Sequence, residues 1–382
     1  MDQFKEIRPY HDEEVRPVID GLLDTPDFIN SIAGFALPTL YRYAPRIARF
    51  LTEKKLRKQL KHVDSVSSMQ SVIAVYMDEM IERTAPRLTH SGLEKLSKDK
   101  SYLFVSNHRD IAMDPAFVNY MLYHAGFDTV RIAIGDNLLK RPFVNDLMRL
   151  NKSFIVMRSL KGRELLKSSK LLSEYIHHCI ETGHNVWIAQ REGRAKDGVD
   201  KTDTALLKML SMAKRSEGFS GSLNALNIVP VSISYEVDPC DAMKADELYQ
   251  KAEKGSFQKD DQSDINSIVT GMIGFKGHVH VAFGDEIKLE SDDAEEAAQI
   301  IDDQVLANYQ LQATNYAALY KLMALCPEQV PELKLPKAES DLRSQESVIA
   351  FEKRLAEIPE NQRLYFLRMY ANPVIRRFAS TS

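Results

Sequence analysis

The spacing of apolar residues changes about a quarter of the way along the chain. From residue 11 to residue 88, apolar residues recur every three or four positions in long runs such as Val66 to Ile81, and this spacing predicts helices. From about residue 100, short apolar runs rich in Val, Ile, Phe and Tyr appear, and they predict strands. The predicted strands are Tyr102–Ser106, Val130–Ile134, Phe154–Met157, Val186–Ala189, Ile228–Tyr235 and Val279–Phe283.

Helix-like segments such as Pro115–Tyr123 and Leu165–Ile180 separate most of these strands. Strands that alternate with helices predict an α/β fold, a layered sandwich with a largely parallel sheet flanked by helices. Residues 293–325 and 345–372 read as further helices. We therefore expect three parts: an N-terminal helical region (1–87), an α/β domain (88–290) and a C-terminal helical region (291–382).

The composition is that of an ordinary soluble protein. Of 382 residues, 44% are apolar and 27% are charged, which excludes a disordered, a collagen-like and a polytopic membrane chain. Cys179, Cys240 and Cys326 lie far apart without a CxxC pair, which argues against a disulfide framework and a structural zinc site and suits a reducing cytosol. The net charge of −4 predicts no nucleic-acid partner.

Two basic segments are candidates for contact with a membrane surface. Residues 42–61 carry eight basic residues against one acidic residue, Glu53, with apolar residues at helical spacing after Pro45. Such a helix can lie on an anionic bilayer, or it can pack on its own domain with a solvated basic face. The segment Arg363 to Arg377 has a similar character. The uncharged stretch Phe28–Tyr41 has 14 residues, fewer than the ~20 that a spanning helix needs.

Polar clusters follow three of the predicted strands. They are residues 107–115, Arg158, and residues 191–196. Because ligands of open α/β sheets bind outside the carboxyl ends of the strands, parallel strands would bring these clusters to one edge.

His108 is the candidate general base of this edge. A carboxylate beside a histidine fixes its tautomer and raises its basicity, and both Asp114 and Asp110 are within reach along the chain. Asp114 precedes Pro115, so it also reads as the N-cap of a helix. The segment Gly218–Ser222 lacks the final glycine of a GxSxG nucleophile motif. His108 is therefore expected to activate a hydroxyl group that arrives on a substrate.

Four basic residues of these clusters suit a phosphate ester, because guanidinium groups match phosphate oxygens. The alternative for each is a solvated surface charge. His278 and His280 alternate along a strand and share a face, but the sequence suggests no third metal ligand. The four basic residues are Arg158, Arg191, Arg194 and Lys196.

At this point the order and spacing of the motifs resemble the glycerolipid acyltransferase family, which includes glycerol-3-phosphate and lysophosphatidate acyltransferases. The resemblance covers about residues 88–290. Two departures indicate a divergent subgroup: five residues rather than four separate His108 from Asp114, and the third-motif arginine comes one position early. The matching segments are Asn107 to Asp114, Asp136 to Phe143, Phe154 to Arg158, Glu192-Gly193-Arg194, Val229-Pro230-Val231 and Phe283 to Ile287.

The resemblance implies transfer of a fatty acyl group from acyl-CoA or acyl-carrier protein to a glycerol-3-phosphate or lysophospholipid hydroxyl in phospholipid biosynthesis. His108 would be the base and Asp114 its orienting partner, with Asp110 still open as a rival. The resemblance implies no metal and no organic cofactor. It also favours a peripheral position on the cytoplasmic face of a membrane. The substrate-binding residues would be Arg158, Arg191, Glu192, Gly193 and Arg194.

Two other functions remain as alternatives. A thioesterase or lipase would need a resident nucleophile, and the sequence offers none that is well placed. A catalytically silent lipid-binding protein of the same fold would bind phospholipid without depending on His108.

Overall fold

The computed structural model describes residues 2–257, 263–335 and 345–379. The chain packs as two compact units. The first contains Met1–Asp78 and Arg131–Tyr175, and the second contains Glu79–Val130 and Ile176–Ser382. This division groups segments that are not consecutive, whereas the three-part division expected from the sequence follows chain order. The latter stays a prediction.

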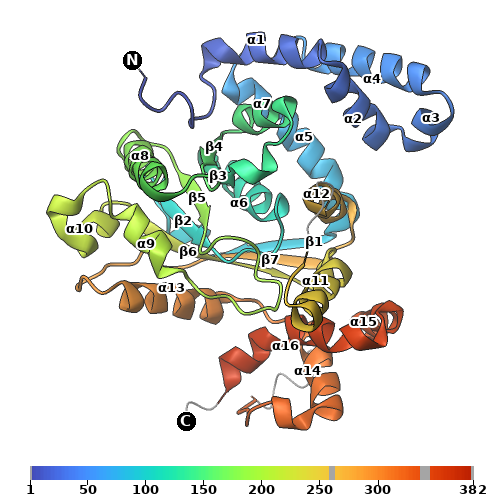
Figure 1. Ribbon diagram of the computed structural model, residues 1–382, viewed down its shortest axis with the longest axis vertical. Helices are drawn as coiled ribbons and strands as arrows, with labels where there is room; N and C mark the ends of the chain where they lie inside the picture. The colour runs from blue at the N-terminus through green and yellow to red at the C-terminus, as the bar shows by residue number, and fades with distance from the viewer. Residues whose placement is uncertain (1, 258–262, 336–344, 380–382) are drawn as a thin grey trace. The chain divides into compact units, whose positions relative to one another are not determined.

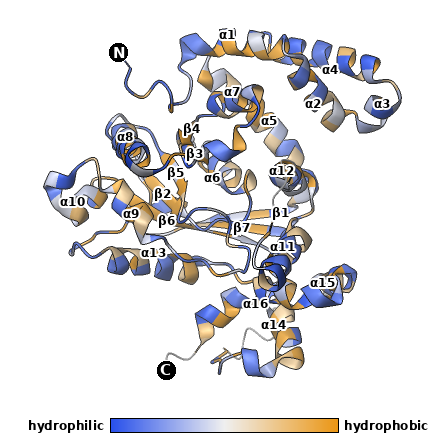
Figure 2. Ribbon diagram, viewed as in Figure 1, coloured by the Kyte–Doolittle hydropathy of each residue, from blue (hydrophilic) through white to orange (hydrophobic). Residues whose placement is uncertain are grey.

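The second unit is built on a mostly parallel sheet. Its strands lie in the order β1-β7-β6-β2-β5, and only the β6–β7 pair among them is antiparallel. Every residue of β6 is buried, so the centre of the sheet reads as a continuous apolar run. Figure 2 shows β2 and β5 as mostly hydrophobic ribbons. The strands are β1 (Arg87–Ser91), β2 (Leu103–Ser106), β5 (Val186–Ala189), β6 (Ile228–Tyr235) and β7 (His278–Phe283).

Helices cover this sheet (Figure 1). Helix α6 packs near β7 and α13 packs on β6, while α14 and α16 pack against each other in a separate C-terminal core that includes Tyr316 and Phe366. The helices of this unit are α6 (Met113–His124), α9 (Thr204–Leu210), α10 (Gly218–Asn224), α11 (Asp241–Lys254), α12 (Ser263–Ile273), α13 (Ala294–Asn308), α14 (Ala313–Leu325), α15 (Gln345–Glu357) and α16 (Arg363–Phe378).

The first unit is mainly helical. It contains the parallel pair β3 (Arg131–Gly135) and β4 (Ser153–Val156). Its core joins α1, α2 and α7 through residues such as Ile19, Phe28 and Phe143. Helices α5 (Val66–Thr84) and α8 (Gly162–Glu181) run from one unit into the other. The remaining helices are α1 (Asp12–Leu23), α2 (Pro26–Ala36), α3 (Pro38–Tyr43), α4 (Pro45–Gln59) and α7 (Pro142–Leu150).

The predicted α/β class with a largely parallel sheet and flanking helices is confirmed. All six predicted strands are present, each within one residue of its expected bounds. Strand β1 is an addition that the sequence did not predict. Its five residues, Arg87–Ser91, are exposed or half-buried and mostly polar, so the apolar pattern of a strand is missing there.

Candidate functional site

Asn107 anchors the loop that carries the candidate base. Its side chain is fully buried at the end of β2. Its Oδ1 accepts the N–H of Ile233 at 2.7 Å, and its Nδ2 donates to the carbonyl of Ile233 at 3.0 Å. The carboxamide therefore replaces a backbone partner for β6 at the point where β2 leaves the sheet. This contact fixes the residue immediately before His108.

His108 and Asp114 are brought together, as the sequence predicted. Nδ1 of His108 lies 2.8 Å from Oδ2 of Asp114. The imidazole is 14% exposed, whereas the carboxylate is fully buried, so solvent and ligands can reach the ring but not its partner. Trp187 of β5 packs edge-on against the ring, with the two ring centroids 5.7 Å apart. Asp114 and Trp187 therefore hold the ring in place, while the edge of the imidazole that does not contact Asp114 is accessible.

The Asp114 carboxylate is surrounded by hydrogen-bond donors. Oδ2 accepts the backbone N–H groups of Arg109 at 2.6 Å and Asp110 at 2.9 Å, besides its contact with His108. Oδ1 accepts the hydroxyl of Tyr235 at 2.6 Å. Burial alone would raise the pKa of Asp114, but His108 and then Tyr235 lower it below its usual value. The group is therefore an anion at neutral pH, and His108 carries its proton on Nδ1.

The structure separates the two rival aspartates. Oδ1 of Asp110 accepts the N–H groups of Ala112 at 3.0 Å and Met113 at 2.9 Å, so Asp110 binds the backbone just before and at the start of α6, whose N-cap residue is Ala112. The prediction that Asp114 is the N-cap is wrong, because α6 begins at Met113 and Asp114 lies inside its first turn. Burial, and then the charge of Asp114, raise the pKa of Asp110. Asp114 is thus the carboxylate that contacts the histidine.

The loop after β5 lies against the backbone of His108. The N–H of Ala195 donates to the carbonyl of His108 at 2.8 Å. The buried guanidinium of Arg109 donates to the carbonyl of Ala195 at 3.0 Å and to the carboxylate of Asp200 at 2.6 Å. These contacts bring Gly193 and Arg194 within two residues, along the chain, of a direct contact with His108.

The side chains of this loop differ in their surroundings. Arg191 is half-buried, while Glu192 and Gly193 are exposed and Gly193 has a φ of 75°. Nη2 of Arg194 donates to the hydroxyl of Ser267 on α12 at 3.3 Å, and its Nη1 is buried without a hydrogen-bond partner among the described residues. The loop is therefore basic and retains donor capacity.

Lys196 closes the same loop. It forms an ion pair with Glu247 of α11, and both side chains are largely buried. Burial lowers the pKa of Lys196 to about 8, although Glu247 opposes the shift. This pair ties the loop to α11.

Arg158 belongs to the first unit, where it follows β4. Its backbone N–H donates to Oδ1 of Asp136 at 3.1 Å, and Ser159 donates to Oδ2 of the same carboxylate. Its side chain passes close to Gly135, where an added Cβ would lie 3.1 Å from Cδ of Arg158. These contacts define its local position, and its role in substrate binding stays a prediction.

Tyr235 and Arg109 are site residues to which the sequence analysis assigned no role. Tyr235 is the last residue of β6, and alternation along that strand puts it on the face of Ile233 rather than that of Ser234. This alternation along β6 was the sequence feature that could have indicated the position of Tyr235. Arg109 gave no comparable signal, because a buried arginine in a loop cannot be told from an exposed one by spacing.

His278 and His280 share one face of β7, as predicted. Oγ1 of Thr89 lies 2.6 Å from Nε2 of His278 and 2.8 Å from Nδ1 of His280. Burial, followed by the nearby His278, lowers the pKa of His280 to about 4, so this ring is neutral at neutral pH. Within residues 2–257, 263–335 and 345–379, no three His, Cys, Asp or Glu side chains are placed to hold a metal ion.

A second candidate surface lies on α3 and α4 of the first unit. We define the α3–α4 surface by its exposed apolar residues, Tyr43, Ile47, Phe50 and Leu51, together with the basic side chains beside them. Tyr43 is 77% exposed and Phe50 is 63% exposed, values that are unusual for aromatic residues of a packed helix. The basic side chains of this surface are Arg42, Arg46, Arg49, Lys54 and Lys55.

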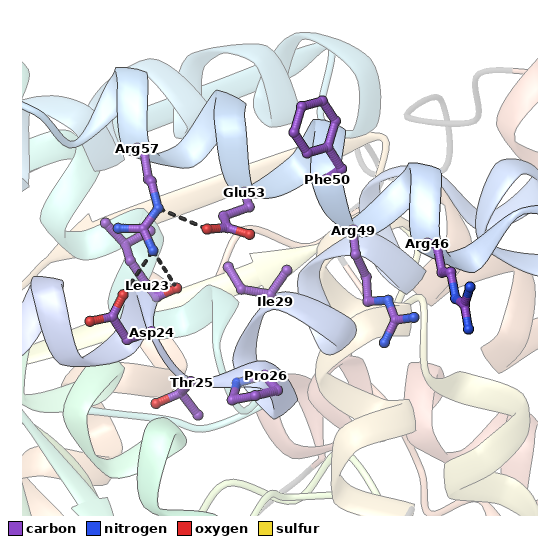
Figure 3. A pocket seen from close by; sticks show the side chains of 10 residues that line it. All are labelled: Leu23, Asp24, Thr25, Pro26, Ile29, Arg46, Arg49, Phe50, Glu53 and Arg57. Carbon is purple, nitrogen blue, oxygen red and sulfur yellow. Dashed lines mark hydrogen bonds and ion pairs between the residues drawn. The ribbon is translucent and has the colours of Figure 1, made fainter.

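A groove with a volume of about 450 Å³ lies beside this surface, between α2 and α4 (Figure 3). At one end Arg57 is neutralised by Asp24 at 2.8 Å and Glu53 at 2.9 Å. At the other end lie Arg46 and Arg49. Arg49 makes only long hydrogen bonds, of 3.3 and 3.4 Å, and Arg46 has no hydrogen-bond or ion-pair partner in the described part of the chain.

The C-terminal basic segment does not form a comparable surface, which corrects the expectation for Arg363 to Arg377. Its apolar residues, among them Phe366 and Tyr370, are buried in the C-terminal core. Arg363, Arg376 and Arg377 donate to backbone carbonyls of neighbouring segments. In the described residues, no helix is both long enough and apolar enough to span a bilayer.

Comparison with known proteins finds similarity to acyltransferases over the part of the chain that holds this site. A family model described as Acyltransferase matches residues 87–234. The chain is 24% identical to a glycerol-3-phosphate acyltransferase of Alteromonas mediterranea over 70% of this chain and 32% of the relative. It is 26% identical to one of Pseudoalteromonas atlantica over 72% of this chain and 36% of the relative. The chain therefore spans about a third of the length of these relatives.

A solved 1-acyl-sn-glycerophosphate acyltransferase from Thermotoga maritima shares 14% identity over 77% of this chain and 99% of that chain, with a TM-score of 0.38. This similarity is too weak to support a conclusion. The residues that the family model matches include His108, Asp114 and the loop after β5. Residues 87–234 are thus similar to an acyltransferase domain, and the curated relatives that resemble the chain are glycerol-3-phosphate acyltransferases.

Proposed function

We propose that the protein transfers a fatty acyl group from acyl-CoA or acyl-carrier protein to a hydroxyl group of a glycerol-3-phosphate or lysophospholipid acceptor in phospholipid biosynthesis. The observation that carries the proposal is the contact between His108 and Asp114 beside a basic loop. The carboxylate is buried and fully hydrogen-bonded, whereas the free edge of the imidazole is accessible. This is the arrangement that a general base requires.

In the proposed reaction, Nε2 of His108 takes the proton of the acceptor hydroxyl while the hydroxyl oxygen attacks the thioester carbonyl. The new C–O bond gives a tetrahedral oxyanion, and Asp114 stabilises the imidazolium. Collapse of the intermediate breaks the C–S bond, and the imidazolium returns the proton to the departing thiolate. The products are the ester and the free thiol. No covalent acyl-enzyme is needed, because the thioester is already activated.

The acceptor phosphate is proposed to bind to the loop after β5. Arg191 and Arg194 supply guanidinium donors, and the exposed Gly193 lets an anion approach the backbone closely. Glu192 is proposed to orient these side chains. The role of Arg158, which belongs to the first unit, stays the expectation that the resemblance gives.

The α3–α4 surface is proposed to hold the protein on the cytoplasmic face of a membrane. Exposed aromatic residues beside unneutralised arginines suit the boundary between acyl chains and anionic headgroups. Arg46 and Arg49 at the open end of the groove would face the headgroup phosphates. Such a position gives the enzyme access to a lipid product.

The test is acyl transfer by the purified full chain. Labelled acyl-CoA and acyl-carrier protein are supplied with glycerol 3-phosphate, lysophosphatidate, other lysophospholipids or no acceptor. We expect one acceptor to give a labelled lipid, and His108→Ala to lower turnover by roughly 10² to 10⁴. Labelled free fatty acid without any acceptor would instead identify a thioesterase. Phospholipid binding without turnover, unchanged in His108→Ala, would identify a silent lipid-binding protein.

The two aspartates provide a sharper prediction about the same site. Asp114→Asn removes the anion that holds the imidazole, and we expect it to lower kcat roughly 100-fold or more. Asp110→Asn keeps an oxygen that can accept the N–H groups of Ala112 and Met113, so we expect little change in kcat. Both variants are compared at equal folded yield by circular dichroism. A larger loss in Asp110→Asn would overturn the assignment of Asp114.

A further inference from the structure

Tyr235 joins the central strand of the sheet to the His108–Asp114 pair. It is 4% exposed, and its hydroxyl lies 2.6 Å from Oδ1 of Asp114. Its ring packs against that of Phe117 on α6, with centroids 6.0 Å apart and planes at 61°. The ring is therefore held by packing, and its hydroxyl has a fixed direction.

The hydroxyl is the donor in this contact. Asp114 is an anion and can only accept. Burial and the charges of Asp114 and Asp110 raise the pKa of Tyr235 well above its usual value, so the phenol keeps its proton at neutral pH.

We propose that Tyr235 is a positioning residue for His108, which fixes the orientation of the Asp114 carboxylate and sets how strongly it holds a proton on the imidazole. The inference rests on the proposed function, because it names a residue that tunes the same base. Tyr235 acts through Asp114, and no contact between it and substrate is implied.

The division of donors between the two carboxylate oxygens supports this role. The three donors on Oδ2, which are the imidazole and two backbone N–H groups, come from residues 108–110, whereas the donor on Oδ1 is the hydroxyl of Tyr235 on β6. Hydrogen bonds from the loop to Oδ2 and from the sheet to Oδ1 therefore fix the orientation of the carboxylate. Without the hydroxyl, Oδ1 would be a buried anionic oxygen with no donor, and the carboxylate would become more basic.

Other charged groups near Asp114 have partners of their own, although Oδ2 of Asp110 is buried without a hydrogen-bond partner among the described residues. Arg109 pairs with Asp200, and Asp238 pairs with Lys244, whose Nζ also donates to the carbonyl of Arg109 at 2.7 Å. The carboxylate of Asp110 faces the N-terminus of α6 through Oδ1. None of these side chains donates to Oδ1 of Asp114 in the described structure, so the Tyr235 hydroxyl is the donor whose removal changes that oxygen.

The experiment compares the pH dependence of acyl transfer in wild type and Tyr235→Phe. We expect kcat to fall roughly tenfold, because a hydrogen bond to a buried charge is lost, with KM for donor and acceptor unchanged. We also expect the acid limb of the rate profile to move to higher pH, because a more basic carboxylate holds the imidazolium proton more tightly.

A second substitution changes the donor in the opposite direction. Incorporation of 3-fluorotyrosine at position 235 keeps the shape of the side chain and makes its hydroxyl a stronger donor. We expect the acid limb to move to lower pH in this variant. It also tests the proposal if Tyr235→Phe does not fold.

Tyr370→Phe is the matched control. Tyr370 is also buried, and its hydroxyl donates to a carboxylate, Oδ2 of Asp241, at 2.7 Å, outside the His108–Asp114 pair. We expect this variant to lose stability but to keep the acid limb of wild type. An acid limb that stays at the wild-type position in Tyr235→Phe and in the fluorinated protein would overturn the proposal.

Separate variants test the proposed function and the role of Tyr235. If His108→Ala is as active as wild type, the proposed function fails. If His108→Ala is inactive but both changes at Tyr235 leave kcat and the acid limb as in wild type, the proposed function survives and the role of Tyr235 does not.

Discussion

Helices α4 and α16 both combine basic and apolar residues, but their surroundings differ. Both carry arginines between aromatic and aliphatic residues, and both read from sequence as candidates for a membrane surface. The two helices belong to different compact units, so each is compared with its own neighbours. Their difference lies in whether the large apolar side chains of the helix are buried or exposed.

Helix α16 uses its residues inside the protein. It buries large side chains, among them Phe366, Leu367 and Tyr370, against α14 and α15. Its arginines donate to carbonyls at the ends of neighbouring segments, as Arg377 does to the carbonyls of Ala307 and Tyr309. Both the apolar and the basic face of the helix therefore have partners.

Helix α4 buries its small residues and leaves its large apolar residues exposed. Its buried residues are the small Ala48 and Thr52, so the helix packs closely on α2 through its smallest side chains. Ile47, Phe50 and Leu51 are left exposed. The lesson is that the size of the residues on the buried face, rather than the number of arginines, separates the two cases.

The largest expected effect is on stability. Phe366→Ala should lower the free energy of unfolding by about 3–5 kcal/mol, because it opens a cavity among fully buried side chains. Phe50→Ala, at an exposed position, should change it by less than about 0.5 kcal/mol. Urea denaturation followed by circular dichroism measures both. Similar losses in the two variants would show that α4 is packed in solution as tightly as α16.

The second expected effect is on membrane binding. Arg46→Glu with Arg49→Glu should weaken binding to vesicles that contain anionic phospholipid by more than about tenfold, because each basic residue near such a surface contributes ~1 kcal/mol. Co-sedimentation with vesicles that contain about one-third phosphatidylglycerol in phosphatidylcholine measures the fraction of protein bound. The melting temperature should stay unchanged.

The control for this variant is Lys208→Glu with Arg215→Glu. It makes the same change in net charge at two exposed residues of the second unit. Its vesicle binding should remain near that of wild type. If both double variants lose vesicle binding equally, net charge alone explains the loss, and the α3–α4 surface is not a specific membrane contact. Competition by free inorganic phosphate would point to a phosphate site rather than a bilayer.

Much of the fold follows from local pattern. Predicted strands such as β2 and β6 are buried on both faces, so they read as apolar runs, and the helices between the strands keep a helical period. The sequence did not predict strand β1, because an edge strand with polar, exposed residues has no such apolar pattern. Its pairing with β7 comes from tertiary structure, which a local pattern does not contain.

The site was predictable only where its residues are close in sequence. His108 and Asp114 are six positions apart, and the start of a helix between them brings the carboxylate to the ring. Tyr235 approaches the same carboxylate from a strand 121 positions away. The sequence also could not separate Asp110 from Asp114, because either carboxylate could cap the helix. Which oxygen faces which donor depends on the path of the loop.

The smallest expected effect concerns Arg377, at the end of α16. Its guanidinium donates to the carbonyls of Leu306, Ala307 and Tyr309, where α13 ends. Since a cation there satisfies carbonyls that the helix leaves unpaired, Arg377→Gln should lower the free energy of unfolding by about 1–2 kcal/mol. Vesicle binding should not change, because this arginine has its partners inside the protein. Arg42→Gln on α3, with an exposed arginine, should give the reverse result: unchanged stability and weaker vesicle binding. A loss of vesicle binding in Arg377→Gln at unchanged stability would mean that α16, like α4, presents its basic residues to a membrane.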